Sequence, residues 1–289
     1  MRRERRVIGL AAVAFIALLA AVGPSADQAT FLGKKESWDY APAMKQVAKK
    51  FRGTPGVVLH LGDSITYASP YTAWARAGAG KTKQDEAVLR WSHCGEENER
   101  DGWYLAHHDL PGPRSYTAAS GIRADQYIVG GFKRMPPLDE ILRTYHPQIA
   151  IVMLGTNDAT QERPVGPYAA DMETIITRLL KDGTMPILST IPPIISDQKR
   201  AVEYNDALWR LAAKYRLPVI DFYGEIVARR PGTSWDGTLL EKDDVHPTEE
   251  HNGVSSLSAP TPANLKESGY LLRGWLSVEK LQEVKRRVL

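Results

Sequence analysis

This sequence of 289 residues contains a single cysteine and carries a formal net charge of only +3. The single cysteine, Cys94, excludes an internal disulfide framework. Residues 1–26 hold four arginines and one glutamate, which account for the whole formal charge of +3, so residues 27–289 sum to zero. A surface without excess positive charge gives no reason to expect nucleic acid or an anionic membrane as a partner.

Long hydrophobic runs are scarce as well. The longest apolar run, Val7–Val22, has 16 residues, whereas a membrane-spanning helix needs about 20. It follows the basic segment Met1–Arg6 and precedes small and polar residues, which is the plan of a secretory signal peptide. We therefore expect residues 1–26 to be a cleaved signal and the protein to be exported, either periplasmic or extracellular. An uncleaved N-terminal anchor, tethering the protein through residues 7–22, is the alternative.

The rest of the chain, residues 27–289, has the composition of one globular domain. Its apolar runs alternate with amphipathic stretches, and four of them predict strands near residues 57–61, 149–154, 185–191 and 218–222. Residues 115–120 are a candidate for a further short strand. Continuously apolar strands alternating with helices are typical of a parallel sheet covered by helices on both faces. The sequence therefore predicts an α/β fold, closed by a long helix over residues 265–288.

A serine follows the first predicted strand. The stretch Val57–Tyr67 reads VVLHLGDSITY, in which an apolar run leads into a glycine turn and then Ser64. In an open parallel sheet, ligands bind beyond the carboxyl ends of the strands, so a nucleophile is expected at this position. A serine in this place also occurs as a plain helix cap. Downstream residues must decide between the two interpretations.

A serine nucleophile needs a base, and the base needs an orienting partner. The loop Asp243-Asp244-Val245-His246 offers both, because a single turn can hold the carboxylate of Asp243 against the imidazole of His246. Asp244, two residues before the histidine, is the rival partner. Taken alone, such an acidic loop is typical of a solvated surface.

An oxyanion hole needs hydrogen-bond donors fixed near the nucleophile. Gly121 and Asn157 each follow a predicted strand, so both are expected at the same edge of the sheet as Ser64. Each also has a plainer interpretation, Gly121 as a turn glycine and Asn157 as a helix cap.

The order of these motifs resembles that of the SGNH (GDSL) hydrolase family over roughly Val57–Thr248. The motifs in question are Gly62-Asp63-Ser64-Ile65, Gly121, Gly155-Thr156-Asn157-Asp158 and Asp243-x-x-His246. The resemblance implies a flavodoxin-like three-layer α/β/α fold with a five-stranded parallel sheet. It also implies ester hydrolysis through an acyl-enzyme, with neither metal nor cofactor. By the same resemblance Ser64 is the nucleophile, His246 the general base and Asp243 its orienting partner. The implied oxyanion hole consists of the N–H groups of Ser64 and Gly121 and the side-chain amide of Asn157. The residues around Gly121 fit the family pattern least well.

Residues 70–114 show no dominant period, so we expect an insertion of loops and short helices above the site. Connections of this length are usually functional or lid-like. Its aromatic residues either line a cleft, where they could stack on sugar rings, or pack the insertion onto the sheet; they are Trp74, Trp91, Trp103 and Tyr104. The clusters His107-His108-Asp109 and His93-Cys94 look metal-like but lack a third well-spaced ligand, so no metal is expected.

The sequence thus predicts an exported serine esterase acting on a small-molecule or polysaccharide ester, with O-acetyl groups of glycans as the favoured substrate. A lipase, thioesterase or lysophospholipase of the same fold is one alternative. A non-catalytic glycan-binding module is another, although such a module would have no need of all five site residues.

Overall fold

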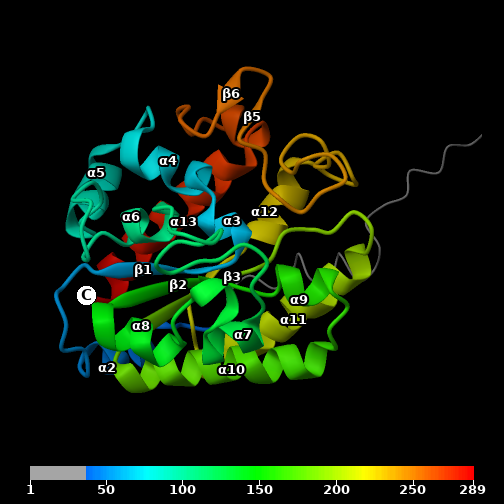
Figure 1. Cartoon of the computed structure of the whole chain (residues 1–289). Helices are drawn as coiled ribbons and strands as arrows, with labels where there is room; N and C mark the ends of the chain where they lie inside the picture. The colour runs from blue at the N-terminus through cyan, green and yellow to red at the C-terminus, as the bar shows by residue number, and fades with distance from the viewer. Residues whose placement is uncertain (1–36) are drawn as a thin grey trace, which may run out of the picture.

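A computed structural model describes residues 37–289 of the chain, so the predicted signal segment lies outside the described residues. At its centre is one parallel sheet with the strand order β1-β2-β3-β4. The strands are β1 (Val58–Gly62), β2 (Ile149–Met153), β3 (Met185–Ser189) and β4 (Val219–Ile220). Every residue of all four strands is buried, as expected for a sheet covered on both faces (Figure 1).

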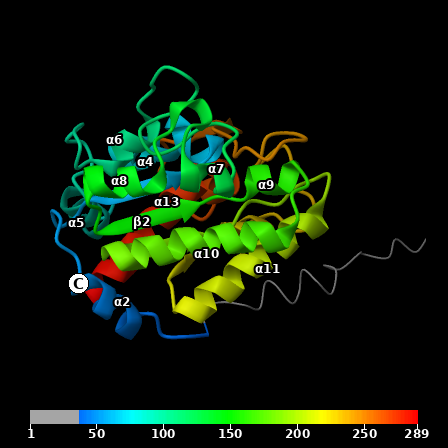
Figure 2. The same cartoon turned by 60° about the horizontal axis from the view of Figure 1, so that its bottom comes forward.

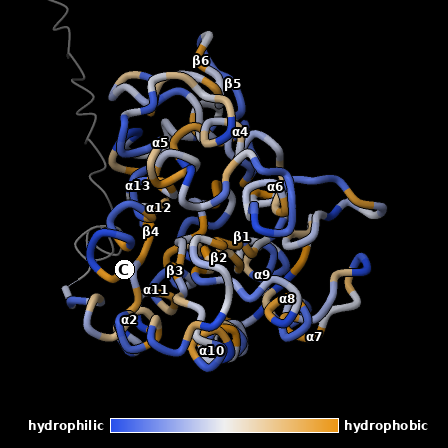
Figure 3. The backbone as a smooth tube through the Cα atoms, turned by 90° about the vertical axis from the view of Figure 1, so that its left-hand side faces the viewer, coloured by the Kyte–Doolittle hydropathy of each residue, from blue (hydrophilic) through white to orange (hydrophobic). Residues whose placement is uncertain are grey.

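Helices cover the two faces of the sheet, and Figure 3 shows the layers nearly end-on. One side carries α4 (Ser69–Ala77), α5 (Lys83–Trp91), α6 (Gly102–His107) and α13 (Gly269–Val288). The other carries α7 (Ala124–Val129), α8 (Leu138–Tyr145) and α10 (Val165–Asp182). In Figure 2, α10 lies beside α11 (Gln198–Tyr215), and the two helices are in contact. The α/β fold predicted from the sequence is confirmed.

The remaining elements are short. They are α2 (Ala41–Ala48), α3 (Ser64–Tyr67), α9 (Thr156–Thr160), α12 (Phe222–Arg229), the 3-10 helices η1 (Phe132–Arg134) and η2 (Asn264–Lys266), and a hairpin of β5 (Glu250–His251) and β6 (Val254–Ser255). The final helix begins at Gly269 rather than 265, because the Ser268 hydroxyl accepts the N–H of Leu271 and caps it there. Within residues 37–289, no helix is both long and apolar enough to cross a membrane.

The sheet has four strands rather than the predicted five. Where a fifth strand would pair with β1, one parallel bridge joins Gly62 to Ala118. The Thr117 hydroxyl donates to the carbonyl of His60 at 2.8 Å, which fixes the segment against β1. The segment cannot continue as a strand because it folds back on itself. The N–H of Ser115 donates to the Ala118 carbonyl at 2.7 Å, and the Ser115 hydroxyl accepts the N–H of Ala118.

Candidate active site

The turn after β1 places Ser64 at the carboxyl edge of the sheet, as the first residue of α3. The preceding Asp63 is the N-cap of α3, and its carboxylate accepts the N–H of Ile65 at 3.0 Å. Gly62 is required here because an added Cβ would lie 2.1 Å from the Thr66 hydroxyl oxygen and 2.8 Å from the Met153 carbonyl. The local sequence therefore turns the chain sharply and leaves the serine hydroxyl at the strand end.

The loop that follows α12 brings His246 to the serine across 182 positions of sequence. Its Nε2 lies 2.8 Å from Ser64 Oγ, and its Nδ1 lies 2.9 Å from Asp244 Oδ1. In the tautomer that satisfies both contacts, Nδ1–H donates to the carboxylate and Nε2 accepts the serine proton. This arrangement can draw the proton from Ser64 while the developing imidazolium is stabilised by Asp244.

The prediction that Asp243 holds the imidazole is wrong in this structure, since Asp244 takes that place. Asp243 adopts a left-handed backbone with φ of +58°, and its side chain is 72% exposed beside Lys242. Its N–H donates to the Asp236 carboxylate, so the side chain is turned away from the histidine. The sequence spacing allowed either aspartate, and the conformation of the loop decided between them.

The Asp244 carboxylate is held in a tight local turn. It accepts the N–H of Val245 at 2.6 Å in addition to the imidazole contact. Partial burial works to raise the pKa of Asp244, but the hydrogen bonds from His246 and Val245 outweigh it, so the pKa lies below its ordinary value. Asp244 is therefore ionised at neutral pH, as an orienting carboxylate must be.

The structure also brings Asn157 and the Gly121 segment to this edge. The Asn157 amide donates to the Ile122 carbonyl at 3.1 Å and contacts the Asp63 carboxylate at 3.4 Å. Gly121 has φ of +82°, a conformation that glycine adopts without strain. In the described part of the chain, the backbone N–H groups of Ser64 and Gly121 make no hydrogen bond to another residue. Asn157 thus links the nucleophile turn, through Asp63, to the Gly121 segment, through Ile122.

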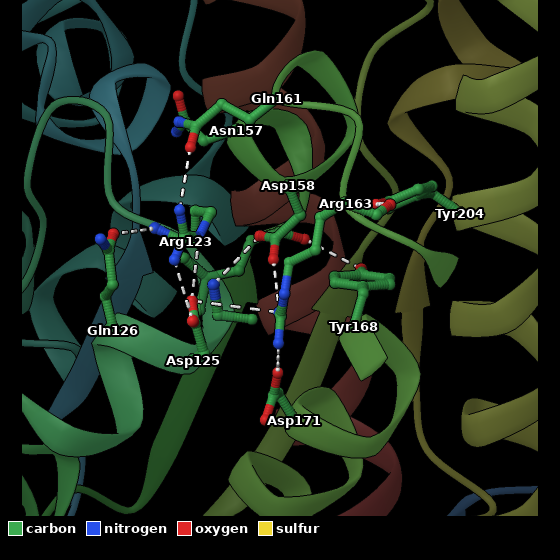
Figure 4. Close-up of polar contacts among 12 residues, drawn as sticks. Arg123, Asp125, Gln126, Asn157, Asp158, Gln161, Arg163, Tyr168, Asp171 and Tyr204 are labelled. Atoms are coloured by element: carbon green, nitrogen blue, oxygen red, sulfur yellow. Dashed lines mark hydrogen bonds and ion pairs between the residues drawn. The ribbon is translucent and has the colours of Figure 1, made fainter. Parts of the chain in front are cut away.

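An ionic cluster around the buried Asp158 carboxylate joins the Gly121 segment to the Asn157 segment (Figure 4). Asp158, fully buried at the start of α9, accepts the N–H of Ala124 at 3.0 Å and the guanidinium of Arg163 at 2.8 Å. Arg123, on the Gly121 side, donates to Gln161 at 3.1 Å. The cluster therefore fixes the Gly121 segment against the Asn157 segment. Sequence reasoning did not assign Asp158 or Arg163, although Asp158 stood inside the motif that identified Asn157.

The insertion contributes packing and a cavity. Trp74 and Trp103 are fully buried, so they belong to the core and cannot stack on a sugar ring. A cavity of about 440 Å³ opens between α4, the end of α6 and the β5–β6 hairpin. Ser64 and His246 are not part of its lining, and the lining residues nearest to them in sequence are Ser69 and Glu249. Its polar lining consists of Ser69, Thr72, Arg76, Glu97, His107, Glu249 and Ser256.

The metal-like clusters are engaged in other contacts. His93 lies between the Glu96 carboxylate at 2.8 Å and the Pro55 carbonyl at 3.0 Å. Burial raises the pKa of the Cys94 thiol to about 12, so this cysteine is protonated and a poor nucleophile. Among residues 37–289, no group of three histidine, cysteine or acidic side chains is placed to bind a metal.

A hydrogen-bonded serine, histidine and aspartate lie at the carboxyl edge of a parallel α/β sheet, which is an arrangement that serine hydrolases use. The sequence model of the GDSL-like Lipase/Acylhydrolase family matches residues 60–252. The chain belongs to this family and is a hydrolase acting on ester bonds. No curated protein sequence matches the chain.

Solved structures with a similar fold include a lipase/acylhydrolase and two esterases. A lipase/acylhydrolase from Enterococcus faecalis is 21% identical, with 78% of this chain and 95% of that chain covered and a TM-score of 0.49. An acetyl xylan esterase from Geobacillus stearothermophilus is 15% identical over 80% and 96% of the chains, with a TM-score of 0.47. The psychrotrophic esterase EstA from a Pseudoalteromonas species is 14% identical over 80% and 99%, with a TM-score of 0.47.

Proposed function

We propose that this protein is an exported serine esterase that removes small acyl groups, such as O-acetyl groups, from glycans. The hydrogen-bonded chain Ser64–His246–Asp244 is the observation that carries the reaction type. Export is the prediction from residues 1–26. N-terminal sequencing of the protein recovered outside the producing cell tests it, and a mature chain that still begins at Met1 would overturn cleavage of the signal.

The proposed reaction proceeds through an acyl-enzyme. His246 Nε2 takes the Ser64 proton as Oγ attacks the ester carbonyl, and Asp244 stabilises the imidazolium. The tetrahedral intermediate then expels the alcohol oxygen, which receives the same proton from His246. Water, deprotonated by His246, next attacks the acyl-Ser64 ester, and the carboxylic acid leaves as Ser64 recovers its proton. The reaction needs only these side chains and water.

Negative charge develops on the carbonyl oxygen during both attacks. The Ser64 and Gly121 N–H groups and the Asn157 amide are the proposed donors to it. The Ile122 carbonyl holds one amide proton of Asn157. The other makes only the long 3.4 Å contact with Asp63, so it is the amide proton that we assign to the oxyanion.

Replacing Asn157 by alanine is expected to lower kcat by about 10²–10³-fold with little change in KM, because the lost donor acts on the transition state. Steady-state kinetics on a chromogenic acetate ester measures this. Glu162→Ala, which removes an exposed side chain just beyond the same helix together with its surface ion pair to Arg200, is the matched control and should keep wild-type kcat. A wild-type kcat in Asn157→Ala would remove Asn157 from the oxyanion hole.

The cavity beside α4 supports a polar alcohol portion rather than a lipid. Its lining combines charged and hydroxyl side chains, which suit sugar hydroxyl groups, with apolar ones such as Ala73, Ala77 and Leu257, and its volume of about 440 Å³ suits a small ligand. Only three large apolar side chains of residues 37–289 are well exposed, namely Val129, Leu257 and Leu289. They form no continuous patch by which a lipase would bind a lipid surface.

A substrate panel tests this specificity. We expect the wild type to release acetate from acetylated xylan, and to hydrolyse a nitrophenyl acetate with kcat/KM at least about tenfold above that for the palmitate ester, since the site lacks a lipid-binding face. Ser64→Ala run in parallel removes background hydrolysis. Efficient cleavage of long-chain esters without acetate release would favour the lipase alternative. Glycan binding without any hydrolysis would favour the binding module.

A further inference from the structure

A positive charge lies buried directly behind the nucleophile turn, and the proposed mechanism makes no use of it. Arg273 belongs to α13, outside residues 60–252 that the family model matches, and it is only 2% exposed. Its guanidinium lies 3.7 Å from the centre of the Tyr71 ring. Because a buried charge is costly unless it is well paired, its hydrogen bonds and counter-charge define what it does.

The hydrogen bonds of Arg273 go to α3, the turn that carries Ser64. Nη1 donates to the Ile65 carbonyl at 2.7 Å, and Nη2 donates to the Thr66 hydroxyl at 2.8 Å. The N–H of the same Ile65 donates to the Asp63 carboxylate. The residue after the nucleophile is therefore held at both ends of its backbone, by an arginine at its C=O and by an aspartate at its N–H.

Asp63 connects this clamp to Asn157, one of the proposed oxyanion donors. It is fully buried, and its second oxygen contacts the Asn157 amide. Asp63 and Arg273 attract one another electrostatically. A change at Arg273 would therefore reach Ser64 through Ile65, and Asn157 through Asp63.

We propose that Arg273 is a positioning residue of the esterase, which fixes the Ser64 turn through Ile65 and Thr66 and supplies the positive charge that balances the buried Asp63 carboxylate. This inference rests on the proposed function. It assigns to the C-terminal helix, beyond the family-matched segment, a part in setting the geometry of the nucleophile.

Because Asp63 is titratable, the role proposed for Arg273 should affect the pH dependence of kcat. Burial raises the pKa of Asp63 to about 6, against the opposing effects of the Ile65 N–H, Arg273 and His246. The charged and titratable groups that face Asp63 are Arg273 and Tyr270 from α13, His246 from its loop, and Tyr168 from α10. Both tyrosines are neutral at working pH, because burial raises their pKa. Removing Arg273 should raise the pKa of Asp63 further. Because a protonated Asp63 holds the Ile65 N–H less strongly, the loss of kcat in acid should then begin at a higher pH.

The experiment compares Arg273→Met with Arg287→Met, a matched change on the same helix at a surface ion pair with Asp39 and Glu283. On a chromogenic acetate ester at pH 7, we expect Arg273→Met to lose about 10- to 100-fold in kcat with KM within about threefold, because misplacement of the nucleophile affects the reaction step. The acidic limb of its kcat–pH profile should move up by about one pH unit. Arg273→Lys, which keeps the charge, should return the acidic limb to its wild-type pH and should recover part of kcat. Arg287→Met should match the wild type.

Two results would overturn the inference. One is a wild-type kcat in folded Arg273→Met. The other is a lowered kcat whose acidic limb stays at the wild-type pH, because a residue with a merely structural role would give that pattern. If the methionine variant does not fold by circular dichroism, Arg273→Gln keeps a donor for Ile65 without the charge, and the same limb shift decides. Failure of the proposed function is distinguishable, because it shows in the wild type as an absence of Ser64-dependent hydrolysis; the inference then falls with it.

Discussion

Replacing Ser64 by alanine is expected to lower kcat by about 10⁴–10⁶-fold, down to what the oxyanion donors and binding alone provide. Among residues 37–289, Ser64 is the one residue whose hydroxyl contacts His246 Nε2, at 2.8 Å. A chromogenic acetate ester, assayed at enzyme concentrations high enough to see a residual rate, measures the loss.

The control for this prediction is a covalent label. A fluorophosphonate should add to the wild type at Ser64, found by peptide mass spectrometry, and should not add to Ser64→Ala. The variant should unfold at a temperature close to that of the wild type, because it loses one hydroxyl with a single side-chain partner. Equal hydrolysis by both proteins would refute the serine mechanism altogether.

The second largest effect is expected from Asp244→Asn. The asparagine keeps the size of the side chain but cannot stabilise an imidazolium, and its amide can favour the wrong histidine tautomer. We expect kcat to fall by about 10²–10⁴-fold, the lower part of the range reflecting a carboxylate that is half exposed to water. The same steady-state assay on the acetate ester measures it.

Asp243→Asn is the matched comparison, with the same chemical change one residue earlier. It removes only an exposed ion pair with Lys242, so kcat should stay within about threefold of the wild type. If Asp243→Asn proved the damaging variant and Asp244→Asn the mild one, the loop would adopt another conformation in the working enzyme. The assignment from sequence spacing would then be restored.

The aspartates show where sequence reasoning reaches its limit. Spacing placed a carboxylate near His246 but could not choose between neighbours, because a single left-handed residue at Asp243 reverses which side chain faces inward. The aromatic residues of the insertion show the same limit. Trp74 and Trp103 look the same in sequence whether they line a cleft or fill a core, and only packing showed that they fill the core.

The prediction of a fifth strand was wrong for a related reason. A short run such as residues 115–120 becomes a strand only if its backbone hydrogen bonds go to a neighbour. Here, within the described chain, three of the six N–H groups of residues 115–120 close a turn around Ser115, and one bridge to Gly62 remains. Arg273 is the converse case, since a lone arginine in an amphipathic helix is typical of a surface position, yet it is buried against α3.

By itself the sequence determined the α/β class and the family, and it predicted the nucleophile and the base, because strand periodicity and motif order can be read along the chain. The tertiary structure alone decided which aspartate meets His246, what holds Asn157 against the Gly121 segment, and what lies behind Ser64. These depend on contacts between segments far apart in sequence, such as the 208 positions between Ile65 and Arg273. No local pattern encodes which of several equivalent side chains will make such a contact.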